Sequence, residues 1–188
     1  MRWTPALCLL AVLEPSLSQA AQPKPALNVI SHDAYLVQRD GTYHYTPTRH
    51  ERARKAAAAE FRRKVASPRI DDVVLVVGIP GAGKSTLVAG QAERRRRTLF
   101  FDATLTTPER RAPLIREALR HGKPVRIVWL KTPLPLALER NARRPPGRRV
   151  PDDIVEDYHR QILAAPPRLA EGAREVIIVE RPTRAREP

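Results

Sequence analysis

The 188-residue sequence has a single cysteine, Cys8. One cysteine excludes a disulfide within the chain and a metal site built from several thiolates. The sequence also lacks any apolar run near the roughly 20 residues that cross a bilayer, so it predicts no membrane partner. At this length, one folded domain with a substantial buried core is expected.

Acidic residues are scarce relative to basic ones. The chain has 20 Asp and Glu against 34 Lys and Arg, which gives a formal net charge of +14 and a pI near 11.1. This excess favours a polyanionic partner such as nucleic acid, because positive charge concentrates phosphate ligands near the surface. Arginine, alanine and proline are all abundant, however, and a compositional bias of the genome would explain part of the charge. Charge alone therefore leaves the partner open.

Residues 73–86 read VVLVVGIPGAGKST. The first five are apolar and mostly β-branched, as in a buried parallel strand. They run directly into the pattern Gly-x-x-x-x-Gly-Lys-Ser, which is typical of a phosphate-binding loop that leads into a helix. A glycine-rich turn without a ligand is the alternative, but the complete motif after a strand favours the P-loop.

The residue types of this loop have chemical reasons. At Gly81 and Gly83 the absence of a side chain lets backbone N–H groups approach a phosphate. Lys84 supplies a cation to the β- and γ-phosphates, and the Ser85 hydroxyl can ligate Mg²⁺. ATP and Mg²⁺ are therefore the expected cofactors. The predicted nucleotide-binding residues are Gly78, Gly81, Ala82, Gly83, Lys84, Ser85 and Thr86.

Strand-like and helix-like patterns alternate along the chain. Strands are predicted at residues 26–30, 73–77, 99–102, 125–130 and 176–179, and helices at residues 49–65, 84–93, 107–120, 134–144 and 152–163. This alternation predicts an α/β P-loop NTPase fold, with a mostly parallel five-stranded sheet sandwiched between helices. The expected domain spans residues 26–181, after an extension at residues 1–25 and before a tail at residues 182–188.

Two aspartates follow predicted strands. Asp33 comes soon after the strand at 26–30, and Asp102 ends the strand at 99–102. Ligand crevices of open parallel sheets lie at the carboxyl ends of the strands, so both carboxylates are candidates for the site. An acidic residue at the end of a strand after a P-loop orients Mg²⁺ or its waters, and Asp102 is expected to do so together with Ser85. For Asp33, a helix cap or a turn is the simpler alternative.

Residues 139–149, ERNARRPPGRR, carry five arginines and one glutamate. Phosphoryl transfer needs cations over the transferred group, and a basic lid would supply them while it excludes water. A solvated basic loop is the alternative, but the P-loop earlier in the chain favours the lid.

Taken together, these motifs resemble the kinase domain of the bacteriophage polynucleotide 5′-kinases, within the wider set of P-loop kinases that phosphorylate hydroxyls. The resemblance rests on residues 78–86, on DATLTTPERR at 102–111, on RNARR at 140–144 and on VPDDI at 150–154. With HDAY at 32–35 and YHYT at 43–46, it covers about residues 28–180.

The resemblance implies roles for individual residues. Asp33 would be the general base for the attacking hydroxyl, and Arg144 the lid arginine at the transferred phosphate. Arg140 would be a lid arginine on the nucleotide side. The implied substrate contacts are Tyr35, Arg39 and Arg111.

Two features depart from the family. The family has an arginine three residues after the base, where it grips the substrate phosphate beside the acceptor hydroxyl; here that position is Leu36, with Arg39 one turn away. In the family, the strand that carries the base lies between the P-loop helix and the next strand, whereas here it precedes the P-loop. We expect this permuted order to keep the site intact, with the first strand at the sheet edge and Asp33 facing Lys84.

The sequence therefore predicts an ATP- and Mg²⁺-dependent kinase whose preferred acceptor is the 5′-hydroxyl of a polynucleotide. The first alternative is a small-molecule kinase similar to zeta-type toxins, antibiotic kinases or kinases of hydroxymethylated bases, which Leu36 favours. The second is a nucleotide-binding module without catalysis. Residues 1–20 partly imitate a secretory signal, yet an enzyme that consumes ATP is expected in the cytoplasm.

Overall fold

The computed structural model describes residues 28–37 and 46–180, and the structural statements below concern these residues. The predicted extension at 1–25, the predicted tail at 182–188 and Arg39 lie outside the described residues.

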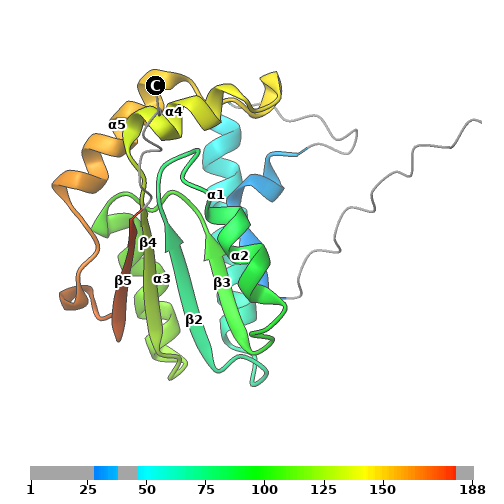
Figure 1. Ribbon diagram of the computed structural model, residues 1–188. Helices are drawn as coiled ribbons and strands as arrows, with labels where there is room; N and C mark the ends of the chain where they lie inside the picture. The colour runs from blue at the N-terminus through cyan, green and yellow to red at the C-terminus, as the bar shows by residue number, and fades with distance from the viewer. Residues whose placement is uncertain (1–27, 38–45, 181–188) are drawn as a thin grey trace, which may run out of the picture.

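A five-stranded sheet forms the centre of the fold, and all of its neighbouring strands are parallel. In the spatial order β1-β3-β2-β4-β5, the sheet consists of β1 (Val29–Ser31), β2 (Asp72–Val77), β3 (Thr98–Asp102), β4 (Val125–Lys131) and β5 (Glu175–Glu180) (Figure 1). Every residue of β3, and every residue of β2 after the first, is buried, as expected for inner strands covered on both faces. The predicted α/β fold is confirmed.

Helices lie on both faces of this sheet, although none of the described helices covers the front of β5 in Figure 1. The described α-helices are α1 (Pro47–Val65), α2 (Lys84–Ala92), α3 (Pro108–Arg120), α4 (Leu134–Ala142) and α5 (Asp152–Ala164). In Figure 1, α1 and α3 lie behind the sheet, α2 lies in front of β3, and α4 and α5 lie above the carboxyl ends of the strands. The last two helices are therefore placed over the end of the sheet where the P-loop begins.

Helix α1 carries the chain back from the edge strand β1 to the inner strand β2. The spacing of Ala57, Phe61 and Val65 predicts one apolar face, and all three side chains are fully buried. The Phe61 ring packs edge to face on the Phe101 ring of β3, with 5.5 Å between the centroids. Because α1 also contacts β1, it holds this short strand against the sheet.

The strand register determines which residues emerge together. Ser31 of β1 pairs with Asp102 of β3, and Asp102 pairs with Val76 of β2. The residues that follow these three therefore leave the sheet together, at the carboxyl ends of the strands.

In the lateral order of the strands, β1 is the outermost strand on one side. The expected position of the first strand at the edge of the sheet is confirmed.

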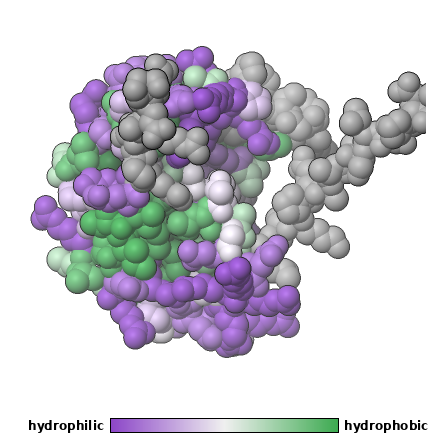
Figure 2. Space-filling model, viewed as in Figure 1, coloured by the Kyte–Doolittle hydropathy of each residue, from purple (hydrophilic) through white to green (hydrophobic). Residues whose placement is uncertain are grey.

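The surface is largely hydrophilic in the view of Figure 2, apart from an apolar area over β5. This strand forms the other edge of the sheet, and its Ile177 and Ile178 are exposed hydrophobic residues. Among the described helices, none has the length and apolar character needed to cross a bilayer.

Arg111 of α3 is completely buried and ties this helix to two loops. Its Nε and Nη2 donate to the Glu171 carboxylate at 2.7 and 2.8 Å, Nη1 donates to the Leu105 carbonyl at 2.9 Å, and Nη2 also donates to the Ala165 carbonyl at 3.0 Å. A guanidinium enclosed in this way has no access to a substrate. The expected substrate contact by Arg111 is therefore corrected to a structural role.

The loop after β3 contains a strained backbone position that Arg111 contacts. Leu105 has φ = +45°, in the left-handed region, which costs a non-glycine residue about 1–2 kcal/mol. The hydrogen bond from Arg111 to the Leu105 carbonyl holds the strained residue in place. Arg111 thus acts on the site only through the shape of this loop.

Replacement of Arg111 by alanine tests its structural role. We expect Arg111→Ala to lower the free energy of unfolding by about 3–5 kcal/mol, because it leaves the Glu171 carboxylate without its buried partner. Urea unfolding curves measure this loss. The control is Arg120→Ala at the exposed end of the same helix, which should cost less than about 1 kcal/mol. Wild-type stability in Arg111→Ala would contradict the assignment.

Candidate active site

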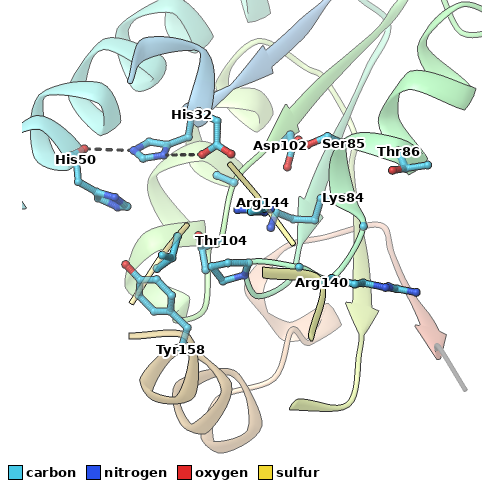
Figure 3. A pocket seen from close by; sticks show the side chains of 16 residues that line it. His32, His50, Lys84, Ser85, Thr86, Asp102, Thr104, Arg140, Arg144 and Tyr158 are labelled. Atoms are coloured by element: carbon cyan, nitrogen blue, oxygen red, sulfur yellow. Dashed lines mark hydrogen bonds and ion pairs between the residues drawn. The ribbon is translucent and has the colours of Figure 1, made fainter. Parts of the chain in front are cut away.

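A crevice of about 240 Å³ lies at the carboxyl ends of the strands (Figure 3). It is bordered by the P-loop after β2, by the segments that follow β1 and β3, and by α4 and the loop after it. The charged residues that line it are Asp33, Lys84, Asp102, Arg140 and Arg144. These four segments are far apart in the chain, and each contains or directly follows a residue predicted for the site.

The P-loop backbone requires glycine at two positions. Gly81 has φ = +84°, and a Cβ there would lie 2.2 Å from the carbonyl oxygen of Ala137 in α4. Gly83 has φ = +91° and is the N-cap of α2. A Cβ at Gly83 would project into the crevice towards Nη1 of Arg140, at 4.0 Å. The loop therefore keeps open a concave backbone surface at a helix N-terminus, which is where phosphates bind.

Lys84 lies at the floor of this surface. Its Nζ donates to the carbonyls of Gly78 at 2.8 Å and Ile79 at 3.2 Å. Desolvation lowers the pKa of Lys84, the charges of Asp102 and Asp33 oppose this shift, and the charge of Arg144 adds to it. The ammonium is thus within electrostatic reach of both predicted carboxylates.

Asp102 and Ser85 form the candidate metal site. The Ser85 hydroxyl donates to Oδ2 of Asp102 at 2.8 Å, and Asp102 is only 4% exposed. Burial raises the pKa of Asp102, although Lys84 and the hydrogen bond from Ser85 oppose the shift. No group of three or more His, Cys, Asp or Glu side chains in the described residues could hold a metal. One hydroxyl and one carboxylate fit Mg²⁺, which usually takes its other ligands from water and substrate phosphates.

Asp33 reaches the crevice from the sheet edge. It belongs to a 3₁₀ turn, His32–Tyr35, that follows β1 directly, and its side chain is 57% exposed. Partial burial raises the pKa of Asp33, but the interaction with His32 and the charges of Lys84 and Arg144 lower it more. The carboxylate is therefore ionised at neutral pH and able to accept a proton.

His32 and His50 have no predicted role, yet His32 lies beside this carboxylate and packs against His50. Nε2 of His32 donates to the backbone carbonyl of His50 in α1 at 3.2 Å, and its Nδ1 lies 3.8 Å from Oδ1 of Asp33. The two imidazole rings pack with 4.3 Å between centroids (Figure 3). The contact depends on where α1 begins relative to β1, so local sequence patterns contain no signal for it.

The basic segment after β4 brings two arginines to the crevice, as expected. Arg140 of α4 and Arg144 after it both line the cavity. Between them, the buried Asn141 donates from Nδ2 to the Val150 carbonyl at 2.6 Å and accepts from the Val150 N–H at 3.2 Å. Sequence analysis gave Asn141 no role, although it closes the loop that carries Arg144.

Other predicted site residues lie elsewhere. The Tyr35 hydroxyl donates to Glu60 of α1, and Tyr35 does not line the crevice. Leu36, where the resembling family has an arginine, is 3% exposed and packs with Ala53 of α1. The expected substrate contact by Tyr35 is therefore replaced by a contact within the protein.

Comparison with known proteins gives a family match. A family model described as an AAA domain matches residues 88–168, from α2 to just beyond α5. This is a family of P-loop NTPase-like kinases, and the match supports a nucleotide-binding, kinase-like domain. The fold is that of a P-loop NTPase. The matched residues include Asp102 and both crevice arginines, whereas the P-loop and β1 precede them. No curated protein matches the sequence.

The raised pKa of Asp102 predicts a pH-dependent need for Mg²⁺. A protonated carboxyl is a poor Mg²⁺ ligand, so the Mg²⁺ concentration for half-maximal ATP turnover should rise as the pH falls towards a pKa above the ordinary 3.8. Titrations of Mg²⁺ at a series of pH values from about 8 to 5 measure this.

Asp102→Asn should need more Mg²⁺ at every pH and show a weaker pH dependence, because only the titration of the ATP phosphates, at about pH 6, then remains. The control is Asp153→Asn, at an exposed position in the first turn of α5, which should behave like the wild type. An Mg²⁺ requirement that is equally pH-dependent in Asp102→Asn would contradict the assignment.

Proposed function

We propose that the protein is an ATP- and Mg²⁺-dependent kinase that transfers the γ-phosphate of ATP to a hydroxyl. The observation that carries this proposal is the ionised carboxylate of Asp33, which lies in the same crevice as the P-loop lysine Lys84 and the arginine Arg144. A nucleotide-binding site needs no such carboxylate, whereas a phosphotransferase needs a proton acceptor beside the transferred group.

The residues divide the reaction between them. Asp33 accepts the proton of the acceptor hydroxyl, whose oxygen attacks the γ-phosphorus while the bond from that phosphorus to the β–γ bridging oxygen breaks. Lys84 and the P-loop N–H groups hold the β- and γ-phosphates, and Arg144 neutralises charge on the transferred phosphoryl group. The products are the phosphorylated acceptor, ADP and a proton.

ATP and Mg²⁺ are expected at defined positions. The P-loop residues and Arg140 would hold the nucleotide, and Ser85 and Asp102 would hold Mg²⁺, which supplies positive charge at the phosphates when it is bound. Because ATP is the phosphate donor, we place the protein in the cytoplasm.

The 5′-hydroxyl of a polynucleotide is our preferred acceptor. The net charge of +14 and the arginines of the crevice favour a substrate that carries further phosphates. The motifs that resemble polynucleotide kinases, in permuted order, support the same acceptor. The permutation itself is part of the proposal.

Leu36 favours the alternative, a kinase for a small hydroxyl-bearing molecule. Its side chain packs with Ala53 and offers no cation to a substrate phosphate. An acceptor without a neighbouring phosphate would not need one. A nucleotide-binding module without catalysis is the remaining alternative, and it predicts no phosphate transfer to any acceptor.

Transfer of labelled phosphate tests the proposal. We expect the wild type to move label from γ-labelled ATP to a 5′-hydroxyl oligonucleotide in the presence of Mg²⁺, and Lys84→Ala to lose this activity because it removes the phosphate-binding cation. Lys84→Ala is also the blank for a contaminating kinase. Label on the oligonucleotide with both proteins would refute the assignment.

Salt distinguishes the two classes of acceptor. The KM of an oligonucleotide acceptor should rise about tenfold or more between about 50 and 200 mM KCl, because binding of several phosphates releases counterions. The KM of ATP, measured in the same titration, is the internal reference and should change much less. A salt-independent oligonucleotide KM, or label only on small alcohols, would favour the small-molecule kinase.

A further inference from the structure

A second cavity, of about 120 Å³, adjoins the crevice. The two cavities share His32, His50, Ala103 and Thr104 as lining residues. A ligand in the second cavity would therefore contact the residues shared with the crevice, among them His32, which directly precedes the proposed base Asp33 in the chain. Nothing in the proposed catalytic machinery uses this space.

Both apolar and polar residues line this cavity. Phe101, Leu105 and Leu114 are buried residues of the core, and the other apolar lining residues are Ala57, Ala58, Ala103 and Pro113. Such walls disfavour a sugar or a polyol, whose hydroxyls would lose their hydrogen bonds to water on entry. They suit a ring with apolar faces.

At about 120 Å³, the cavity restricts the group that it can hold to a single small ring. An apolar cavity of about 150 Å³ in another protein holds benzene. His50 contributes a flat wall, and its ring is neutral at physiological pH because burial, together with the charges of His32 and Arg110, lowers its pKa to about 4. A neutral ring can pack against a heterocycle without desolvation of a charge.

Polar groups line the same cavity and can contact the edge of a heterocycle or the group attached to it. Thr104 and Glu109 offer oxygens that accept hydrogen bonds, and Arg110 offers N–H groups. In the described residues, the Arg110 guanidinium lies 5.4 Å from the centre of the Tyr158 ring and makes one hydrogen bond, to Thr106 at 3.4 Å. Its remaining donors are available to a ligand, such as the phosphate that follows a terminal nucleoside.

We propose that this cavity binds the base of the acceptor's terminal nucleoside, so that the 5′-hydroxyl is presented to Asp33. This inference rests on the proposed kinase function and deepens it, since it assigns a cavity to the base of the acceptor. The second cavity would select a heterocycle close to the reacting hydroxyl. Its lining residues belong neither to the P-loop nor to the basic segment at 139–149.

An abasic acceptor tests the proposal. Two oligonucleotides are compared, identical except that one has a tetrahydrofuran residue without a base at its 5′ end; both keep the 5′-hydroxyl and every phosphate. We expect kcat/KM to be about tenfold or more lower for the abasic acceptor, since a stacked base contributes about 1–3 kcal/mol. Equal kcat/KM values would overturn the proposal.

Neighbouring alanines on α1 provide matched variants. Ala58 lines the cavity and is half-buried, whereas Ala59 is exposed and does not line it. Ala58→Leu should fill the cavity, lower kcat/KM for the normal acceptor to the abasic value and leave the abasic acceptor unaffected. Ala59→Leu should behave like the wild type.

Three controls keep the result interpretable. Circular dichroism and thermal unfolding establish that both variants fold. The KM of ATP should be the same in all three proteins, and a rise confined to Ala58→Leu would mean that the cavity holds the donor base instead, which overturns the proposal. An equal loss with both acceptors in Ala58→Leu would also overturn it, because that pattern indicates damage to the catalytic site.

Direct binding separates this inference from the proposed function. If no oligonucleotide is phosphorylated, calorimetric titrations with cytidine and with ribose still test the cavity. Binding of cytidine but not ribose to the wild type and Ala59→Leu, and its loss in Ala58→Leu, would support the base site although the proposed acceptor had failed. Absence of cytidine binding to the wild type would overturn the base site itself.

Discussion

The parallel pairing of β1 with β3 is the constraint on which the site depends. β1 has only three residues, yet its Ser31 lies opposite Asp102, and the chain places Asp33 two residues later at the same edge as the P-loop. The pairing is stabilised from outside the strand, by the packing of α1 on the sheet through Phe61 and Phe101 and by the contact of Leu36 with Ala53. The side chain that departs from the resembling family at Leu36 thus helps to hold the proposed base in position.

The pKa values of two carboxylates in the crevice are shifted in opposite directions. Asp102 is buried, which raises its pKa, while Asp33 is open to the crevice and has its pKa lowered by His32, Lys84 and Arg144 despite partial burial. Such different environments allow two residues of the same type to have different chemical roles. In the proposed reaction, Asp102 binds the metal together with Ser85, and Asp33 accepts the proton of the acceptor hydroxyl.

Much of this architecture could be predicted from the sequence because it depends on local patterns. Consecutive residues predict the strand and P-loop at 73–86 and the strand that ends at Asp102. Apolar residues at helical spacing predict the apolar face of α1. The structure confirms these elements. Arg111 could not be placed in this way, because its partners Glu171 and Ala165 lie 60 and 54 residues away. The same holds for the packing of His32 with His50, which depends on how α1 lies against β1, and for the cavity beside it.

The single-turnover rate of phosphate transfer in Asp33→Asn decides whether Asp33 is the base of the reaction. The variant keeps the size of the side chain and removes its charge. We expect an affinity for ATP close to that of the wild type and a transfer rate lower by about 10²–10⁴, the usual contribution of a positioned base. Asp153→Asn, which removes an exposed charge from α5, should retain the wild-type rate. An unchanged rate in Asp33→Asn would contradict the account, because the carboxylate at the sheet edge would then take no part in the reaction.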